Sequence, residues 1–174
     1  MTDPGIIQSP STYAVMNSDQ SERYSRQIKL PQLGESGQKR LLDARVLIIG
    51  MGGLGSPVSM YLAAAGVGHL VISDYDRVDE SNLQRQIVHT QASVNELKAT
   101  SARDTLLRLN PAVSVDALNY ELGDEELREQ VTQADVVVDC TDNFPSRFEL
   151  NRISLATGTP VVSGAAIRWE GQVS

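Results

Sequence analysis

The sequence predicts an α/β fold for residues 45–174, a Rossmann-like and mostly parallel sheet with helices on both faces. Apolar stretches of strand length alternate along the chain with longer stretches of helical period. The first apolar stretch, residues 46–49, leads directly into a turn with four glycines. Four consecutive apolar residues, three of them β-branched, are typical of a strand buried on both faces of a parallel sheet.

The glycine turn at residues 50–55 has the G-x-G-x-x-G spacing of a phosphate-binding loop. Gly50 permits the tight turn, Gly52 lets the backbone approach a phosphate, and Gly55 lets the next helix pack against the strand. That helix is expected over residues 56–65, and its N-terminus offers unpaired N–H groups and a positive dipole to an anion. The segment therefore predicts a nucleotide site, against the alternative of a tight turn without a ligand.

A second strand is expected over residues 69–74, and it ends in Asp74, 24 positions after Gly50. An acidic side chain at this place accepts hydrogen bonds from ribose hydroxyls in dinucleotide-binding folds. The alternative is an aspartate that begins a turn. The glycine loop and Asp74 fit an NAD-dependent oxidoreductase and an ATP-using enzyme equally well.

The other segments comprise an N-terminal extension, two helices and the remaining elements of the sheet. Residues 1–17 are rich in Ser, Thr, Pro and Gln and are predicted to be disordered. Within residues 18–44, Ser18 or Asp19 is expected to cap a helix that reaches Ile28, and a second helix follows. Beyond residue 74 we expect a polar helical turn at 81–89, helices at 95–109, 125–132 and 145–157, and strands at 113–117, 135–140 and 160–163.

The chain stops inside one more expected strand, residues 169–174, without a helix cap or a closing turn. We therefore expect a piece of a longer protein, whose C-terminal strands are missing from this sheet. A sheet edge left open in this way favours aggregation.

Charge and cysteine content argue against several classes of function. With 15 basic and 22 acidic side chains the net charge is −7, which argues against a nucleic-acid-binding surface. Cys140 is the single cysteine, so these residues form neither an internal disulfide nor a cysteine-only metal site. No apolar run reaches the ~18 residues of a membrane helix, and the first residues lack the features of a signal peptide. We expect a cytoplasmic protein that has no membrane partner.

Three charged groups at the ligand edge of the expected sheet favour ATP over NAD. Arg85 follows the second strand and Lys98 lies near the start of the next helix, and both cations suit the β and γ phosphates of ATP. Asp142 follows the fourth strand and can hold Mg²⁺ against those phosphates, while Asp139 either competes as the ligand or orients the turn. The alternative for each cation is a solvated surface position, and Cys140 is interpreted as a small buried apolar residue.

Four motifs, collinear with the family pattern from about residue 20 onward, resemble the ThiF/MoeB/HesA family, bacterial relatives of ubiquitin-activating enzymes. They are Arg23-Tyr24-Ser25-Arg26-Gln27, Gly50-Met51-Gly52-Gly53-Leu54-Gly55, Ser81-Asn82-Leu83-Gln84-Arg85-Gln86 and Asp139-Cys140-Thr141-Asp142-Asn143. Residues 164–172 are closer to the molybdopterin-synthase-activating branch, whereas residues 23–26 are equally similar to the thiamine branch.

The resemblance implies adenylation of the C-terminal glycine carboxylate of a small ubiquitin-like sulfur-carrier protein, MoaD- or ThiS-like, with MgATP as co-substrate and pyrophosphate as product. A carboxylate is a poor nucleophile toward an anionic phosphate, so catalysis requires charge neutralisation and in-line positioning. The matched positions imply that Arg85 and Lys98 neutralise charge and that Asp142 holds Mg²⁺. They also imply nucleotide contacts from Gly50, Gly52, Gly53, Gly55, Asp74, Ser81, Asn82 and Asn143.

Arg26 resembles an arginine that dimers of the family insert into the partner's site, which implies a homodimer. Its alternative is a helix-surface cation paired with Glu22 four residues earlier. Longer family members add two cysteine pairs that bind a structural Zn²⁺, and those ligands are absent from residues 1–174. Two other classes stay open: a non-catalytic nucleotide-binding module of this fold, and an NAD-dependent oxidoreductase. The pathway, thiamine or molybdenum cofactor, is open as well.

Overall fold

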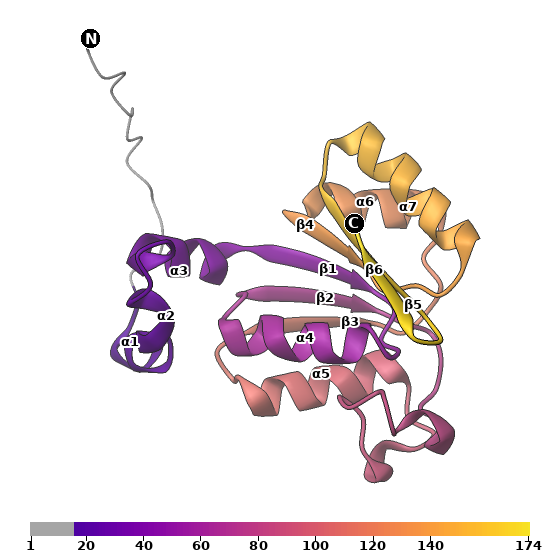
Figure 1. Cartoon of the computed structure of the whole chain (residues 1–174), viewed down its shortest axis with the longest axis horizontal. Coiled ribbons are helices and arrows are strands. Elements are labelled where there is room, and N and C mark those ends of the chain that lie inside the picture. The colour runs from indigo at the N-terminus through magenta and orange to yellow at the C-terminus, as the bar shows by residue number, and fades with distance from the viewer. Residues whose placement is uncertain (1–15) are drawn as a thin grey trace.

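A computed structural model describes residues 16–174 and arranges them around one six-stranded sheet, with helices on both faces (Figure 1). The strand order is β3-β2-β1-β4-β5-β6, in which the first five strands are parallel and β6 is antiparallel to β5. The predicted Rossmann-like class is confirmed. Most of the segment that was predicted to be disordered, residues 1–15 of 1–17, lies outside the described residues.

The strand order reverses beside the central strand β1, which pairs with β2 on one side and with β4 on the other. Loops that leave the carboxyl ends of β1 and β4 therefore diverge, and such a switch point is where sheets of this kind bind ligands. The strands are β1 (Arg45–Ile49), β2 (His69–Ser73), β3 (Ser114–Leu118), β4 (Val136–Asp139), β5 (Val161–Ile167) and β6 (Glu170–Val173).

Helices α4 (Gly55–Ala65) and α5 (Lys98–Leu109) cover one face of the sheet, and α6 (Asp124–Gln133) and α7 (Phe144–Thr157) cover the other (Figure 1). Alternate residues of β1 enter two separate cores. Ile48 packs in the core beneath α4 and α5, while Leu47 packs in the core beneath α6 and α7. Burial on both faces explains why the strand is continuously apolar.

Three short helices, α1 (Ser18–Arg23), α2 (Ser25–Ile28) and α3 (Gly34–Asp43), lie at the end of the sheet where β1 begins (Figure 1). The prediction of a single helix that reaches Ile28 is wrong, because this segment forms two helices that are separated at Tyr24. Tyr24 is buried, and its hydroxyl accepts a hydrogen bond of 2.8 Å from the Asn110 amide. The N-terminal cap is Asn17, neither Ser18 nor Asp19, and its side chain accepts from the backbone N–H of Gln20.

Two other predicted boundaries are wrong. The helix expected from residue 95 begins at Lys98, because Asn95 is left-handed with φ 75° and Leu97 is extended and bridges to Arg77. The strand expected to end at residue 163 is β5, and it continues to Ile167 because its second half pairs with β6. The polar helical turn expected at 81–89 begins with a short 3₁₀ helix, η1 (Glu80–Asn82), and a second one, η2 (Gln91–Ser93), follows beyond it. Among the described helices, none combines the length and the apolar character that crossing a bilayer requires.

Candidate nucleotide-binding site

The glycine loop between β1 and α4 needs glycine at two positions for its own shape. Gly50 has φ +93°, and a Cβ there would lie 2.8 Å from the carbonyl oxygen of Cys140. A Cβ on Gly55 would lie 1.9 Å from the carbonyl oxygen of Gly50. Gly52 differs, because its Cβ would meet only the Gln86 amide nitrogen, at 3.8 Å. The fold therefore does not require glycine at position 52, and the space above it is available to a ligand.

Met51 lies between the first two glycines, and hydrogen bonds to its backbone N–H and to its carbonyl hold it in place. Its N–H donates to the Asp74 carboxylate at 2.7 Å, and its carbonyl lies 3.2 Å from Nε2 of His89. Asp74 follows β2 directly, as predicted, and its other oxygen accepts from the backbone N–H of Asp76 at 2.9 Å. This carboxylate both begins a turn and supports the glycine loop.

His89 also supports this loop, a role that the sequence did not predict. Its imidazole is 4% exposed and lies 2.9 Å from the hydroxyl of Ser101 on α5. Because a carbonyl only accepts, Nε2 carries the hydrogen toward Met51, and Nδ1 accepts from Ser101. Burial lowers the pKa of His89, the Met51 carbonyl opposes this, and the nearby Lys98 charge lowers it further. No local motif indicates this role, since its partners lie 38 and 12 residues away.

Replacing His89 with leucine is expected to destabilise the protein by about 1–3 kcal/mol, because two buried polar groups lose their partner. His89→Gln keeps an amide donor for Met51 and should recover part of that loss. In the wild type the pKa of His89 is lower in the folded protein than in the unfolded chain. As the pH falls, the unfolded chain therefore binds a proton at His89 first, and the free energy of unfolding decreases below about pH 6.5. Urea unfolding between pH 8 and pH 5 measures both effects. An identical pH slope in wild type and His89→Gln would contradict the assignment.

Arg85 lies against the glycine loop, and Asn82 holds its side chain. A Cβ on Gly53 would lie 3.3 Å from Cδ of Arg85, and the Arg85 guanidinium donates to Asn82 Oδ1 at 3.0 Å. The Gln86 amide donates to the same oxygen at 3.0 Å, while its own buried oxygen lacks a hydrogen-bond partner within the described chain. Ser81 is exposed, and its backbone N–H is held by Asp79 at 2.8 Å.

Lys98 is the first residue of α5, and the surface alternative for it is wrong. The residue is only 8% exposed, and its ammonium donates to the Asp76 carboxylate at 2.8 Å. Its backbone N–H donates to the Asp76 carbonyl, also at 2.8 Å. Arg85, by contrast, is exposed and forms no ion pair among the described residues. One of the two predicted phosphate ligands is therefore unpaired and the other has a counter-ion.

The two aspartates after β4 have different environments. Asp139 is 2% exposed and already accepts from the Thr141 N–H at 3.0 Å, the Thr141 hydroxyl at 2.7 Å and the Ser163 hydroxyl at 2.8 Å. It therefore orients the turn, which is the alternative that the sequence left open. Asp142 is exposed, with no hydrogen bond or ion pair to the described residues. Asn143 caps α7 by accepting from the Ser146 N–H at 3.0 Å.

The donor set at this edge fits Mg²⁺ better than a metal that needs several protein ligands. Within residues 16–174 no group of three or more His, Cys, Asp or Glu side chains could hold a metal ion. Mg²⁺ takes one or two carboxylates together with phosphate oxygens and water, and Asp142 offers one such carboxylate. Burial raises the pKa of the Cys140 thiol to about 11, so this group stays protonated. That agrees with the interpretation of Cys140 as a packing residue.

Arg26 lies far from the glycine loop of its own chain. Its neighbour Gln27 donates to the carbonyl of Ala65, the last residue of α4, at 3.1 Å. The loop joins the other end of this 11-residue helix, about 15 Å away at 1.5 Å per residue. The predicted pair with Glu22 is absent from the described ion pairs, because the helix is interrupted between the two residues. The structure does not bring Arg26 to its own chain's candidate site.

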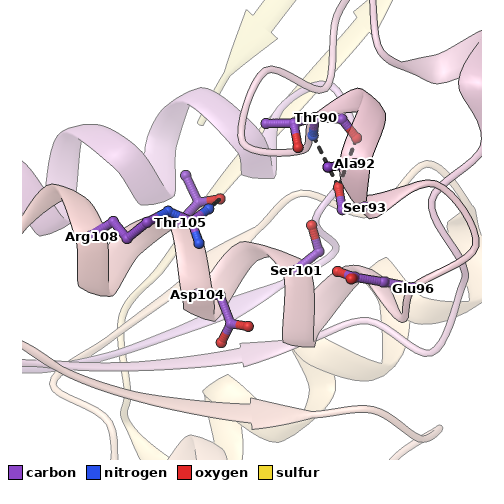
Figure 2. A pocket seen from close by; sticks show the side chains of 8 residues that line it. All are labelled: Thr90, Ala92, Ser93, Glu96, Ser101, Asp104, Thr105 and Arg108. Carbon is purple, nitrogen blue, oxygen red and sulfur yellow. Dashed lines mark hydrogen bonds between the residues drawn. The ribbon is translucent and has the colours of Figure 1, made fainter.

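Two surface pockets lie outside the candidate site, although Ser101, which lines the first of them, also bonds to His89. The first, of about 130 Å³, is lined by polar side chains of η2 and α5, including Ser93, Ser101 and Arg108 (Figure 2). The second, of about 290 Å³, lies beside α1 and Pro111. Neither contains a predicted nucleotide ligand, so the candidate site is the edge of the sheet rather than either pocket.

Comparisons of this chain with known proteins agree on one family. The chain matches the ThiF family over residues 24–174. It is 48% identical over 161 residues to a molybdopterin-synthase adenylyltransferase of Escherichia coli K12, covering 92% of this chain and 65% of that protein. It is 46% identical over 158 residues to a sulfur carrier protein ThiS adenylyltransferase of the same organism, covering 91% and 63%.

Among solved structures, Escherichia coli MccB with ATP superposes with a TM-score of 0.74 at 28% identity, over 83% of this chain and 44% of that one. The chain spans just under two thirds of the length of both adenylyltransferases. The family predicted from the four motifs is confirmed by the extent and identity of these matches. This chain belongs to the ThiF family.

Proposed function

We propose that this chain supplies the ATP-binding part of an enzyme that adenylates the C-terminal glycine carboxylate of a small ubiquitin-like sulfur-carrier protein. The observation that carries the proposal is the arrangement at the carboxyl edge of the sheet. The glycine loop lies there with Arg85 against Gly53, and the Asp74 carboxylate beneath it. Support also comes from relatives that are named as adenylyltransferases of such carriers.

In the proposed reaction a carboxylate oxygen of the carrier attacks the α-phosphorus of ATP. A new bond joins that oxygen to phosphorus, the bond from the α-phosphorus to the bridging oxygen breaks, and pyrophosphate leaves with the electron pair. Arg85 and Lys98 would neutralise the charge that builds up on the leaving phosphates. Asp142 would hold Mg²⁺, which supplies further neutralisation when it is bound. Asp74 would accept hydrogen bonds from the ribose.

ATP is favoured over NAD for three reasons. The charged groups of the site suit a polyphosphate, and a structure of similar fold contains ATP. An oxidoreductase of this class uses a proton-relay group, but His89 is buried and both of its nitrogens already have partners. His69, the other histidine, begins β2 at the opposite edge of the sheet and is bonded to Asp116.

The proposed enzyme is a homodimer in which Arg26 contributes to the site of the other subunit. Support comes from its exposure, its lack of an acidic partner among the described residues, and its distance from the glycine loop of its own chain. The carrier is of the MoaD or ThiS type, and the two pathways differ in which carrier is accepted.

ATP–pyrophosphate exchange tests the proposal directly. The full-length protein is incubated with MgATP, labelled pyrophosphate and a purified carrier that ends in Gly-Gly, either MoaD-like or ThiS-like. Exchange with one carrier, lost when its last glycine is deleted, is the expected result and also identifies the pathway. ATP binding without exchange for either carrier would favour the non-catalytic module, and NADH binding without ATP binding would favour the oxidoreductase.

A further inference from the structure

The proposed reaction does not by itself explain the ion pair between Asp76 and Lys98. The ammonium and the carboxylate are 2.8 Å apart, and the backbone N–H of Lys98 also donates to the Asp76 carbonyl. Asp76 in turn donates its N–H to Asp74 at 2.9 Å. The proposed ribose ligand and the proposed phosphate ligand are therefore joined through one residue, Asp76.

The two partners differ in their freedom to move. The Lys98 side chain is 10% exposed, so its stem is fixed by packing, whereas the Asp76 side chain is 59% exposed. Rotation of the Asp76 carboxylate into solvent meets little resistance, while withdrawal of the lysine would disturb its packing. Before a nucleotide binds, the positive charge of Lys98 is compensated by this carboxylate. A phosphate that binds Lys98 has to compete with the Asp76 carboxylate.

We propose that Asp76 is an exchangeable counter-ion that Lys98 releases when the phosphates of ATP bind and recovers when pyrophosphate leaves. Asp76 would thus act on the phosphates only through the charge of Lys98, without contact with the substrate. It keeps the buried ammonium compensated in the empty site and weakens its hold on the product. This inference rests on the proposed function, since it takes the anion at Lys98 to be a polyphosphate.

A fixed structural role for the same pair predicts the opposite change in affinity. If Asp76 only held Lys98 in place, its removal would loosen the ammonium and weaken the binding of polyphosphates. If Asp76 competes with the phosphates, its removal strengthens their binding. The sign of the change in pyrophosphate affinity therefore separates the two roles.

The test is Asp76→Asn in the full-length protein, with pyrophosphate and MgATP binding measured by isothermal titration calorimetry. We expect pyrophosphate to bind about fivefold more tightly. This is the size of change expected when the exposed carboxylate that competes for Lys98 is removed. The pyrophosphate-induced rise in Tm should also exceed that of the wild type, because the ligand then compensates an otherwise unpaired buried charge. An unchanged or weaker affinity would overturn the inference.

Three further variants make the result specific. Asp104→Asn removes the same charge from a residue paired with Arg103 on α5, and its pyrophosphate affinity should match the wild type. Asp76→Glu keeps a carboxylate and should bind pyrophosphate within about twofold of the wild type. In an Asp76→Asn, Lys98→Met double variant the gain should vanish, and a gain that persists would contradict the proposal. A wild type that binds neither pyrophosphate nor MgATP would refute the proposed function itself.

Discussion

Asp142→Asn is expected to lower ATP–pyrophosphate exchange by about 100-fold while leaving the fold intact. The carboxylate is exposed and has no hydrogen bond to the described residues, so its loss removes no internal interaction. The amide keeps the size of the side chain but lacks the charge that Mg²⁺ requires. Exchange assays over a range of Mg²⁺ concentrations, with thermal unfolding in parallel, measure the two expectations separately.

The matched control is Asp139→Asn, three residues earlier. This carboxylate accepts hydrogen bonds from Thr141 and Ser163 in a buried position, so the substitution should lower Tm and leave the Mg²⁺ dependence of any residual exchange unchanged. If Asp142→Asn exchanged at the wild-type rate, the metal assignment at this edge of the sheet would be lost.

Gly52→Ala is expected to fold as the wild type does but to bind ATP at least about tenfold more weakly. Its φ lies outside the left-handed region, and the added Cβ would meet only the Gln86 amide, at an ordinary contact distance of 3.8 Å. In the complex, however, the methyl group would occupy the space through which the backbone approaches a phosphate. A shift of about 1.4 kcal/mol corresponds to the tenfold change. Calorimetric titration with ATP measures it.

Two other glycines provide the comparison. Gly55→Ala places its Cβ 1.9 Å from the Gly50 carbonyl oxygen, so it should cost about 3 kcal/mol of unfolding free energy. Gly123→Ala has no atom within 4 Å of the added carbon and should leave ATP affinity unchanged, with a loss of stability of no more than about 1 kcal/mol because Gly123 caps α6. Wild-type ATP affinity in Gly52→Ala would mean that this loop does not approach a phosphate.

The elements that could be predicted are those whose signal is local in the sequence. Three such signals are the apolar run of β1, the glycine spacing, and the polar residues that directly follow β2 and β4, and each of them spans only a few positions. Parallel strands bring their carboxyl ends to one edge of the sheet, so Asp74 and Asp142 could be assigned to that edge from strand order alone.

The features that were missed depend on contacts between distant segments. Helix α1 ends at Arg23 because Tyr24 is buried and bonded to Asn110, 86 residues further along the chain. Similarly, His89 supports the loop through Met51, 38 residues earlier. Asp76 lies two positions from Asp74, but nothing local to it indicates a pair with Lys98. Periodicity carries no information about such partners, which are set by tertiary packing.

The double support of Met51 has a thermodynamic consequence for ligands that occupy only part of the site. Each Asp74 oxygen already accepts one backbone N–H and retains a second lone pair for a ribose hydroxyl. A nucleoside bound there would restrict the carboxylate and, through it, the amide of Met51 at the start of the loop. Part of the ordering entropy of the loop is then lost before any phosphate arrives. If Asp74 binds the ribose as proposed, adenosine and pyrophosphate offered as separate molecules are expected to bind with positive cooperativity although they do not touch.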